Sequence, residues 1–336
     1  PYFRFLLVFL FISYFMEKNL NILNKNLNIL IIIVSILFLD SSIQYIFGKN
    51  ILGFPIVDFG NYRISSFFGS ELILGGYIAR ILPIILSLIF LSRDLKNKKN
   101  VDIKLSIICF LSISIAIYSG ERIAVFHTVL ISFFTIFFLN DKNLAKKIFI
   151  ITFFISSFFI FVTDNKIKTR LVVVTIQSFQ EVDKYANFNS NIVLFSQSHH
   201  SHIISGYKMF LDSPFIGHGL KSFRSLCNDE RYRINKFSCT THPHNIFIHF
   251  LSEIGLIGLL FYIISFFYFF RNFIKDLFKL REPYIKSKQC VAFSILLYYL
   301  PIPSGSFFNN YLSYQFYFLL SFYLLFLNLS KNKQEI

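Results

Sequence analysis

Two histidines stand at the start of a long apolar segment, in the stretch Thr-His-Pro-His-Asn that begins at residue 241. We expect His244 in the first turn of a membrane helix, with Thr240 or Thr241 as its cap and Pro243 at its first position. A helix N-terminus disfavours imidazolium and lowers the pKa of a histidine. A neutral imidazole at the membrane boundary suits a general base. The alternative is a histidine that only caps the helix.

Two arginines, Arg63 and Arg122, occur in short connections that are otherwise nearly neutral. A guanidinium group matches the geometry of phosphate oxygens, so both residues are candidates for binding a phosphorylated substrate. The alternative is an arginine that reaches from the membrane boundary to water or pairs with Glu71 or Glu121.

Two carboxylates, Asp40 and Glu253, lie near the ends of apolar segments, where an ionisable group is a functional candidate by default. Glu253 follows His244 by nine residues. That separation is roughly 13 Å along a helix, too far for direct orientation of the imidazole. A structural pair between Glu253 and an arginine is the alternative.

The run His-His-Ser-His at 199–202 invites a metal interpretation, but no Cys-x-x-Cys or His-Glu-x-x-His pattern supports it. The outer connections also lack the paired aspartates that hold Mg²⁺ on a diphosphate. We therefore expect no metal and no cofactor, and we expect arginine and lysine to neutralise any bound diphosphate.

These groups must be positioned by membrane helices, because 54% of the residues are hydrophobic and only 15% are charged. The sequence predicts an all-α polytopic membrane protein with about nine transmembrane helices. The predicted segments are 1–16, 27–47, 72–92, 103–118, 123–139, 147–163, 245–270, 289–303 and 311–330.

Lysine and arginine mark one side of the membrane. They cluster in the connections 17–26, 93–104, 140–147 and 271–288 and in the C-terminal tail, all on one side if the segments alternate. The positive-inside rule makes that side cytoplasmic. The net charge of +15 is thereby explained by topology, and we expect no nucleic-acid partner. The chain begins with Pro, so we expect further residues before it, with an odd number of spans if the start is cytoplasmic.

The chain divides into N-terminal transmembrane helices at 1–163, a large outer loop at 164–243 and C-terminal transmembrane helices at 244–330. Short helices are predicted in the loop near 171–183 and 199–212. Cys227 and Cys239 both lie in this loop, where an oxidising compartment would favour a disulfide. Two free thiols are the alternative. Cys109 and Cys290 fall inside spans and are interpreted as packing residues.

Several patterns on the predicted outer face resemble the O-antigen ligase and O-antigen polymerase superfamily. His244-Asn245 is followed by nine residues, Gly255, two residues and Gly258, which is similar to the family's ligase motif. The remaining stretches that resemble family patterns are Arg63–Gly75, Tyr118–Ala124, Met209–Gly219, which ends in P-x-x-G-x-G, and Pro301–Asn310.

Two departures from the family pattern stand out. Ser66 replaces the glycine expected three residues after Arg63. The arginine that often opens the helix before P-x-x-G-x-G is replaced by the histidine-rich run at 199–202. A histidine such as His200, or one of Arg170, Arg224 and Arg231, is expected to take its place.

The resemblance implies a GT-C-like, inverting and metal-independent glycosyltransferase of the bacterial inner membrane that faces the periplasm. It implies His244 as the base, with Arg63, Arg122, Asn245, His200 and Arg224 as contacts to the diphosphate or glycan. The implied donor is an undecaprenyl-diphosphate-linked glycan. The acceptor would be lipid A–core for a ligase or a carrier-linked glycan for a polymerase, in lipopolysaccharide or surface polysaccharide biosynthesis. Membrane lipids are the remaining partner.

Two other classes of membrane protein make different predictions. A polysaccharide flippase or other transporter should place polar residues at mid-span with broken helices or repeats, whereas the polar residues here gather at one face. A metal-sensing membrane protein built on the histidine-rich loop should bind zinc and tolerate changes at Arg63 and Arg122. The enzymatic hypothesis depends on one expectation, that His244 and the two arginines converge beyond the lipid on the exported side.

Overall fold

The computed structural model describes residues 3–58, 62–92, 98–140, 146–151, 153–154, 169–173, 176, 196–279, 282–303 and 305–332. Six helices within these ranges are long and apolar enough to cross a membrane. They identify a multi-pass, mainly α-helical membrane protein, whereas the number of about nine spans stays a prediction. The six are α2 (Leu20–Phe47), α3 (Leu74–Leu91), α4 (Lys98–Tyr118), α5 (Arg122–Phe134) with the π-helical turn Thr135–Leu139, α11 (Ile246–Leu277) and α13 (Asn310–Asn332).

The chain forms two compact units. Unit 1 comprises residues 1–172, 273–297 and 317–336, and unit 2 comprises residues 173–272 and 298–316. Because of these boundaries, α11 and α13 each contribute residues to both units.

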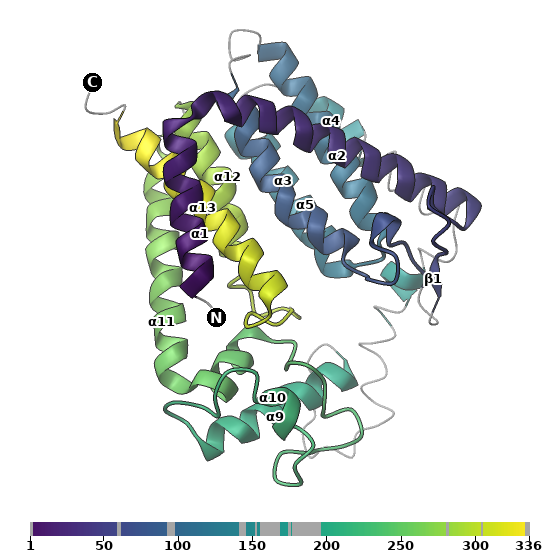
Figure 1. Ribbon diagram of the computed structural model, residues 1–336, viewed down its shortest axis with the longest axis vertical. Coiled ribbons are helices and arrows are strands. Elements are labelled where there is room, and N and C mark those ends of the chain that lie inside the picture. The colour runs from purple at the N-terminus through teal and green to yellow at the C-terminus, as the bar shows by residue number, and fades with distance from the viewer. Residues whose placement is uncertain are drawn as a thin grey trace. The chain divides into compact units, whose positions relative to one another are not determined.

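The centre of unit 1 is α3, which packs against α4, α5 and α12 (Pro283–Leu297) (Figure 1). A small buried cluster lies where α3, α4 and α5 meet, and it consists of Ala79, Ala116 and Ala124. The Ser287 hydroxyl on α12 donates to the Ser87 carbonyl on α3 at 2.7 Å. Small side chains and such hydrogen bonds let membrane helices approach closely, which explains why α3 is largely buried.

The predicted connection at 17–26 is wrong, because α1 (Phe3–Lys18) and α2 are separated only by Asn19. The Asn19 side chain donates to the Phe15 carbonyl at 2.9 Å, and its own carbonyl accepts from the Ile22 amide. One residue with a non-helical φ of −128° is enough to divide the helices. Lys25 consequently lies on α2 rather than in a loop.

The predicted span 289–303 is also displaced, since α12 covers Pro283–Leu297. Proline suits the first turn of a helix, and the prolines at 301 and 303 cannot continue one. The predicted charged loop 271–288 shrinks, because α11 continues to Leu277. Lys288 on α12 forms a 2.7 Å ion pair with Asp276 at the end of α11.

Unit 2 contains α9 (Gln197–Asp212), which confirms the helix predicted at 199–212, and the short helix α10 (Phe223–Leu226). Met209, Phe223, Cys227 and Tyr232 form a buried core between them. A disulfide joins Cys227 to Cys239, whose Cα atoms are 4.9 Å apart. Most of the predicted span 147–163 and of the predicted helix 171–183 lies outside the described residues.

Candidate functional site

The start of α11 is capped by Asn245. Its side-chain oxygen accepts hydrogen bonds from the amides of Phe247 at 3.0 Å and Ile248 at 3.2 Å. The expected caps, Thr240 and Thr241, are therefore wrong, and the helix starts at residue 246, so Pro243 does not hold its first position. The oxygen of an amide or hydroxyl side chain can accept hydrogen bonds from these backbone amides. This gives a physical reason for the polar residue that follows the motif histidine.

His244 lies just before this cap in a left-handed conformation, with φ of 54°. Few residues other than glycine adopt this conformation, and it is concentrated at functional positions. The side chain is partly exposed. Its ring centroid is 4.1 Å from that of His242. His199 and His202 each lie 5.3 Å away. Four imidazoles thus form one cluster, which we call the histidine cluster.

The first two turns of α9 supply two members of this cluster, His199 and His202, which are three residues apart on one helix face. Ser196 caps α9, and its hydroxyl lies 3.3 Å from the His199 amide and 2.8 Å from the His199 Nδ1 atom. Burial and, to a smaller extent, the His199 charge lower the pKa of His202 to about 4. Burial also lowers the pKa of His200, the histidine chosen from the sequence. Burial therefore favours the neutral form of His202 and His200.

Among the residues that the structure describes, no three His, Cys, Asp or Glu side chains are arranged to hold a metal ion. The histidine cluster was missed from the sequence, where only the run at 199–202 stood out. The signal that could have found it is the three-residue spacing of His199 and His202 on a predicted helix.

The helix α11 is broken at Gly255, whose φ of 66° and ψ of −165° are not helical. The P-x-x-G-x-G segment fills the break. The amides of Leu256 and Ile257 donate to the carbonyls of Pro214 and Phe215, at 2.8 and 3.2 Å. In return, the carbonyls of residues 252 and 253 accept from the amides of residues 218 and 219. The segment thereby satisfies backbone groups that a broken membrane helix would otherwise leave unpaired.

Glycine is required at two of these positions. A Cβ atom on Gly217 would lie 2.4 Å from the Glu253 carbonyl carbon, and one on Gly255 would lie 2.3 Å from the Phe215 carbonyl oxygen. Both residues also have positive φ values, 65° and 66°. The two glycine patterns recognised separately in the sequence are therefore the two sides of one backbone contact.

Glu253 is buried beside this contact, and its partners differ from the expected arginine. Its carboxylate accepts from the amides of Lys221 at 2.5 Å and Phe223 at 3.2 Å. The His249 Nε2 atom lies 3.4 Å away on the same helix. Backbone amides and a histidine thus replace a guanidinium, and the carboxylate ties the start of α10 to α11.

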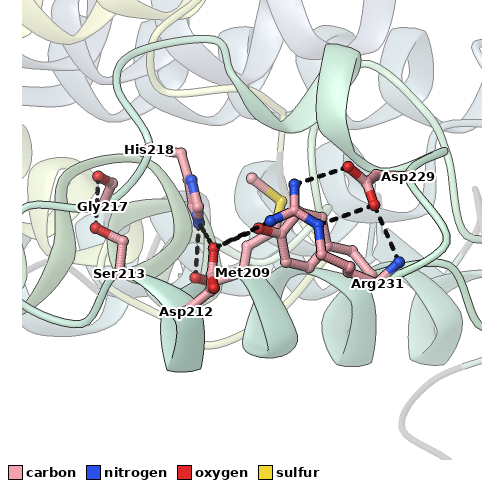
Figure 2. A network of polar contacts seen from close by, with 8 residues as sticks. Met209, Asp212, Ser213, Gly217, His218, Asp229 and Arg231 are labelled. Carbon is pink, nitrogen blue, oxygen red and sulfur yellow. Dashed lines mark hydrogen bonds and ion pairs between the residues drawn. The ribbon is translucent and has the colours of Figure 1, made fainter.

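A second polar network holds the end of α9 against the P-x-x-G-x-G segment (Figure 2). His218 Nε2 donates to the Met209 carbonyl at 2.9 Å and lies 3.6 Å from Asp212. The exposed Arg231 pairs with Asp229 at 2.8 Å and holds the pKa of that carboxyl at about 2. Arg224, another candidate for the missing arginine, is exposed on α10.

In unit 1, Arg63 belongs to the short strand β2 (Tyr62–Arg63), which pairs antiparallel with β1 (Val57–Asp58). Its guanidinium donates to the carbonyls of Ser119 at 3.3 Å and Leu72 at 3.1 Å. It also lies 3.9 Å from the Glu121 carboxylate. Burial lowers the pKa of Arg63, and Glu121 opposes that shift. The sequence offers Glu71 and Glu121 as partners for an arginine, and in the structure Arg63 pairs with Glu121.

These contacts bring the Arg63–Gly75 and Tyr118–Ala124 patterns together. A Cβ atom on Gly75 would lie 2.3 Å from the Ser119 hydroxyl and 2.7 Å from the Glu121 carboxylate. The same Glu121 oxygen, Oε2, accepts from the Gly76 amide at 2.6 Å. Arg122 directly follows as the first residue of α5. Glycine at the start of α3 thus allows the α4–α5 turn, with its Glu and Arg, to pack directly onto it.

Ser66 has a φ of 52°, which explains why the family pattern has glycine at this position. Three groups hold the strained residue. Its hydroxyl donates to Asp40 at 2.5 Å, its amide donates to Gln44 at 2.7 Å, and its carbonyl accepts from Asn50 at 3.1 Å. Asp40, a functional candidate from the sequence, is buried and fixes the connection between α2 and α3.

Arg80 was missed from the sequence, although an arginine inside an otherwise apolar span is a functional candidate. It lies on α3, one turn beyond Gly76, and its Nη1 atom donates to the Gly76 carbonyl at 2.8 Å. Arg63, Arg80 and Arg122 and the Glu121 carboxylate therefore belong to the region formed by the N-terminal end of α3 and the α4–α5 turn.

The helices and the interlocked glycine patterns define a multi-pass membrane protein with polar groups at the ends of its spans. Residues 107–263 match the family model described as O-antigen ligase. This match confirms the resemblance to the O-antigen ligase and O-antigen polymerase superfamily. It includes Arg122 and His244, and Arg63 lies before it. The family indicates a glycan-transferring membrane protein of polysaccharide biosynthesis. No curated protein matches the chain.

Proposed function

We propose that the protein transfers a glycan from a polyprenyl-diphosphate carrier to an acceptor hydroxyl at the periplasmic face of the bacterial inner membrane, with His244 as general base. The observation that carries the proposal is the placement of His244. It is partly exposed, held in a left-handed conformation before the start of a membrane helix, and surrounded by imidazoles. A sugar hydroxyl is a weak nucleophile, and a positioned base accelerates such a reaction by about 10²–10⁴-fold.

The diphosphate is already a good leaving group, so it needs stabilisation of its charge more than a proton. Arg63 and Arg122 are the proposed source of that charge, and the gathering of Arg63, Glu121 and Arg122 in one unit supports it. Direct attack on the anomeric carbon would invert it without a metal ion. We keep Asn245, His200 and Arg224 as proposed contacts to the glycan or diphosphate.

The proposal includes a GT-C-like arrangement in which helices 1–163 and 244–330 flank a periplasmic loop at 164–243. It requires that the two arginines and His244 converge on one substrate. Cysteine pairs at 63 and 244 that crosslink with a short reagent would support convergence. Labelling that placed them on opposite sides of the membrane would exclude it.

The decisive experiment compares His244→Ala with His218→Gln. The first removes the proposed base and should lower transfer by about 10²–10⁴-fold while the protein stays in the membrane. The second changes a histidine of the same unit that contacts Asp212 and the Met209 carbonyl, and should keep most of the activity. Full transfer by His244→Ala would disprove the assignment.

The acceptor is tested by deletion in the source organism and gel analysis of lipopolysaccharide. Cores that carry a single repeat would indicate a polymerase. Bare cores with accumulated carrier-linked polymer would indicate a ligase. Bare cores with carrier-linked glycan trapped on the cytoplasmic side, rather than on the periplasmic side, would favour the alternative of a flippase.

A further inference from the structure

The P-x-x-G-x-G segment exposes two large apolar side chains. Phe215 is 66% exposed and Ile216 is 70% exposed, and Leu211 and Leu220 on either side are exposed as well. A loop that stood in water would not be expected to expose so many large apolar residues within ten positions.

The exposed side chains are joined to a helix face that must contact lipid. After its break, α11 exposes a stripe of apolar residues at helical spacing, comprising Leu256, Ile257, Leu260, Phe261 and Ile264. The first two of these donate their amides to the carbonyls of Pro214 and Phe215. The apolar part of the loop therefore begins at the same level as the exposed stripe of a membrane span.

The backbone of the segment is suited to an apolar environment. The amides of Gly217, His218 and Gly219 donate to the carbonyls of residues 213, 252 and 253. The Gly217 carbonyl accepts from the Ser213 hydroxyl at 2.9 Å. Irregular backbone is tolerated at membrane depth only where its polar groups are paired within the protein, as these are.

We propose that Phe215 and Ile216 insert into the hydrocarbon of the outer leaflet, so that the segment is a lipid-embedded wedge beside the break in α11. The occupant of this surface is the acyl chains of membrane lipids. The wedge fixes where the lipid ends on α11, near Gly255. The short first part of the helix, which follows His244, then lies at the boundary between lipid and water.

The chain contains no tryptophan, so a single introduced tryptophan reports its own surroundings. The test uses the full chain in vesicles of phosphatidylethanolamine and phosphatidylglycerol, with and without bromine on the acyl carbons near the headgroup. Phe215→Trp is the test variant, and Ile216→Trp repeats it at the next position in case the first disturbs folding. Ile257→Trp on α11 is the lipid-facing reference. Phe237→Trp makes the same substitution at an exposed phenylalanine elsewhere in the loop.

We expect blue-shifted emission at positions 215 and 216, with loss of intensity in brominated lipid as at position 257. Position 237 should be quenched by acrylamide instead. Acrylamide quenching at 215 and 216 equal to that at 237 would overturn the proposal. Protection from both quenchers would overturn it too, because a protein partner such as a second copy of this chain would then cover the surface.

Discussion

Two regions of the molecule both depend on glycine for the close approach of two chain segments, but the polar groups beside the two contacts differ. At the start of α3, Gly75 lets the α4–α5 turn approach the helix. At the break in α11, Gly217 and Gly255 let two backbone segments touch. The first contact places the Glu121 carboxylate beside Arg63, whereas the second belongs to the unit that holds the histidine cluster, in which burial lowers the pKa of His202 to about 4.

The difference lies in what each carboxylate binds. Glu121 contacts the Arg63 guanidinium and one amide, and both residues remain partly exposed. Glu253 is fully buried and contacts amides and His249. A substrate anion can compete with Glu121 for the partly exposed Arg63 guanidinium, whereas the groups that Glu253 binds are amides and a buried histidine. The α3 region is therefore suited to holding a charged ligand, and the α11 region to holding a base in place.

The largest expected effect comes from breaking the α11 contact. Gly255→Ala forces a Cβ atom against the Phe215 carbonyl at a positive φ and should lower the free energy of unfolding by about 3 kcal/mol or more. Gly305→Ala, where the nearest side-chain atom is 3.8 Å from the new Cβ, should be nearly neutral. Thermal unfolding of both variants in detergent checks this. Equal melting temperatures would mean that the break is not rigid.

The α3 region is tested by a pair of variants that separate charge from structure. Glu121→Gln keeps an oxygen for the Gly76 amide and removes the negative charge beside Arg63. Its effect on stability should be below about 1 kcal/mol because the pair is partly exposed. Arg63→Gln should reduce transfer at least tenfold, since it removes a proposed diphosphate contact worth roughly 1.5–3 kcal/mol.

Initial rates against donor concentration separate the two variants. Glu121→Gln is expected to keep the donor KM or lower it, because more positive charge remains for the anion. A higher KM in Glu121→Gln, together with unchanged activity in Arg63→Gln, would show that the ion pair is structural and that Arg63 does not bind the donor.

The smallest effect is a pH dependence from the histidine cluster. The pKa of His202 falls from 6.5 to about 4 on folding. Between these two values the unfolded chain binds a proton at His202 that the folded chain does not bind. The contribution of His202 should therefore leave the free energy of unfolding at its maximum above pH 6.5 and lower it as the pH falls toward 4. His202→Gln should flatten that decline. Melting temperatures that fall equally in both proteins over this window would assign the effect to other groups. The Asp229 carboxyl, whose pKa is about 2 in the folded protein, titrates below this pH window.

Membrane helices were predictable because the cost of exposing backbone and polar groups to lipid leaves a long apolar run few alternatives. Their ends were less predictable. Asn19 divides two helices and Pro283 begins another, and both effects depend on single residues that composition does not reveal. The helix predicted at 199–212 forms as α9, in a stretch where Ile203, Tyr207 and Phe210 recur at helical spacing.

The sequence by itself determined the membrane class, the motif histidine and the patterns of glycine. Those properties follow from residue type and local spacing, which one chain displays directly. Only the tertiary structure decided that Glu253 binds the amides of Lys221 and Phe223, and that His199 and His202 lie beside His244. Each of these depends on which segments distant in sequence meet, and that choice is set by close packing of the whole unit rather than by any local pattern.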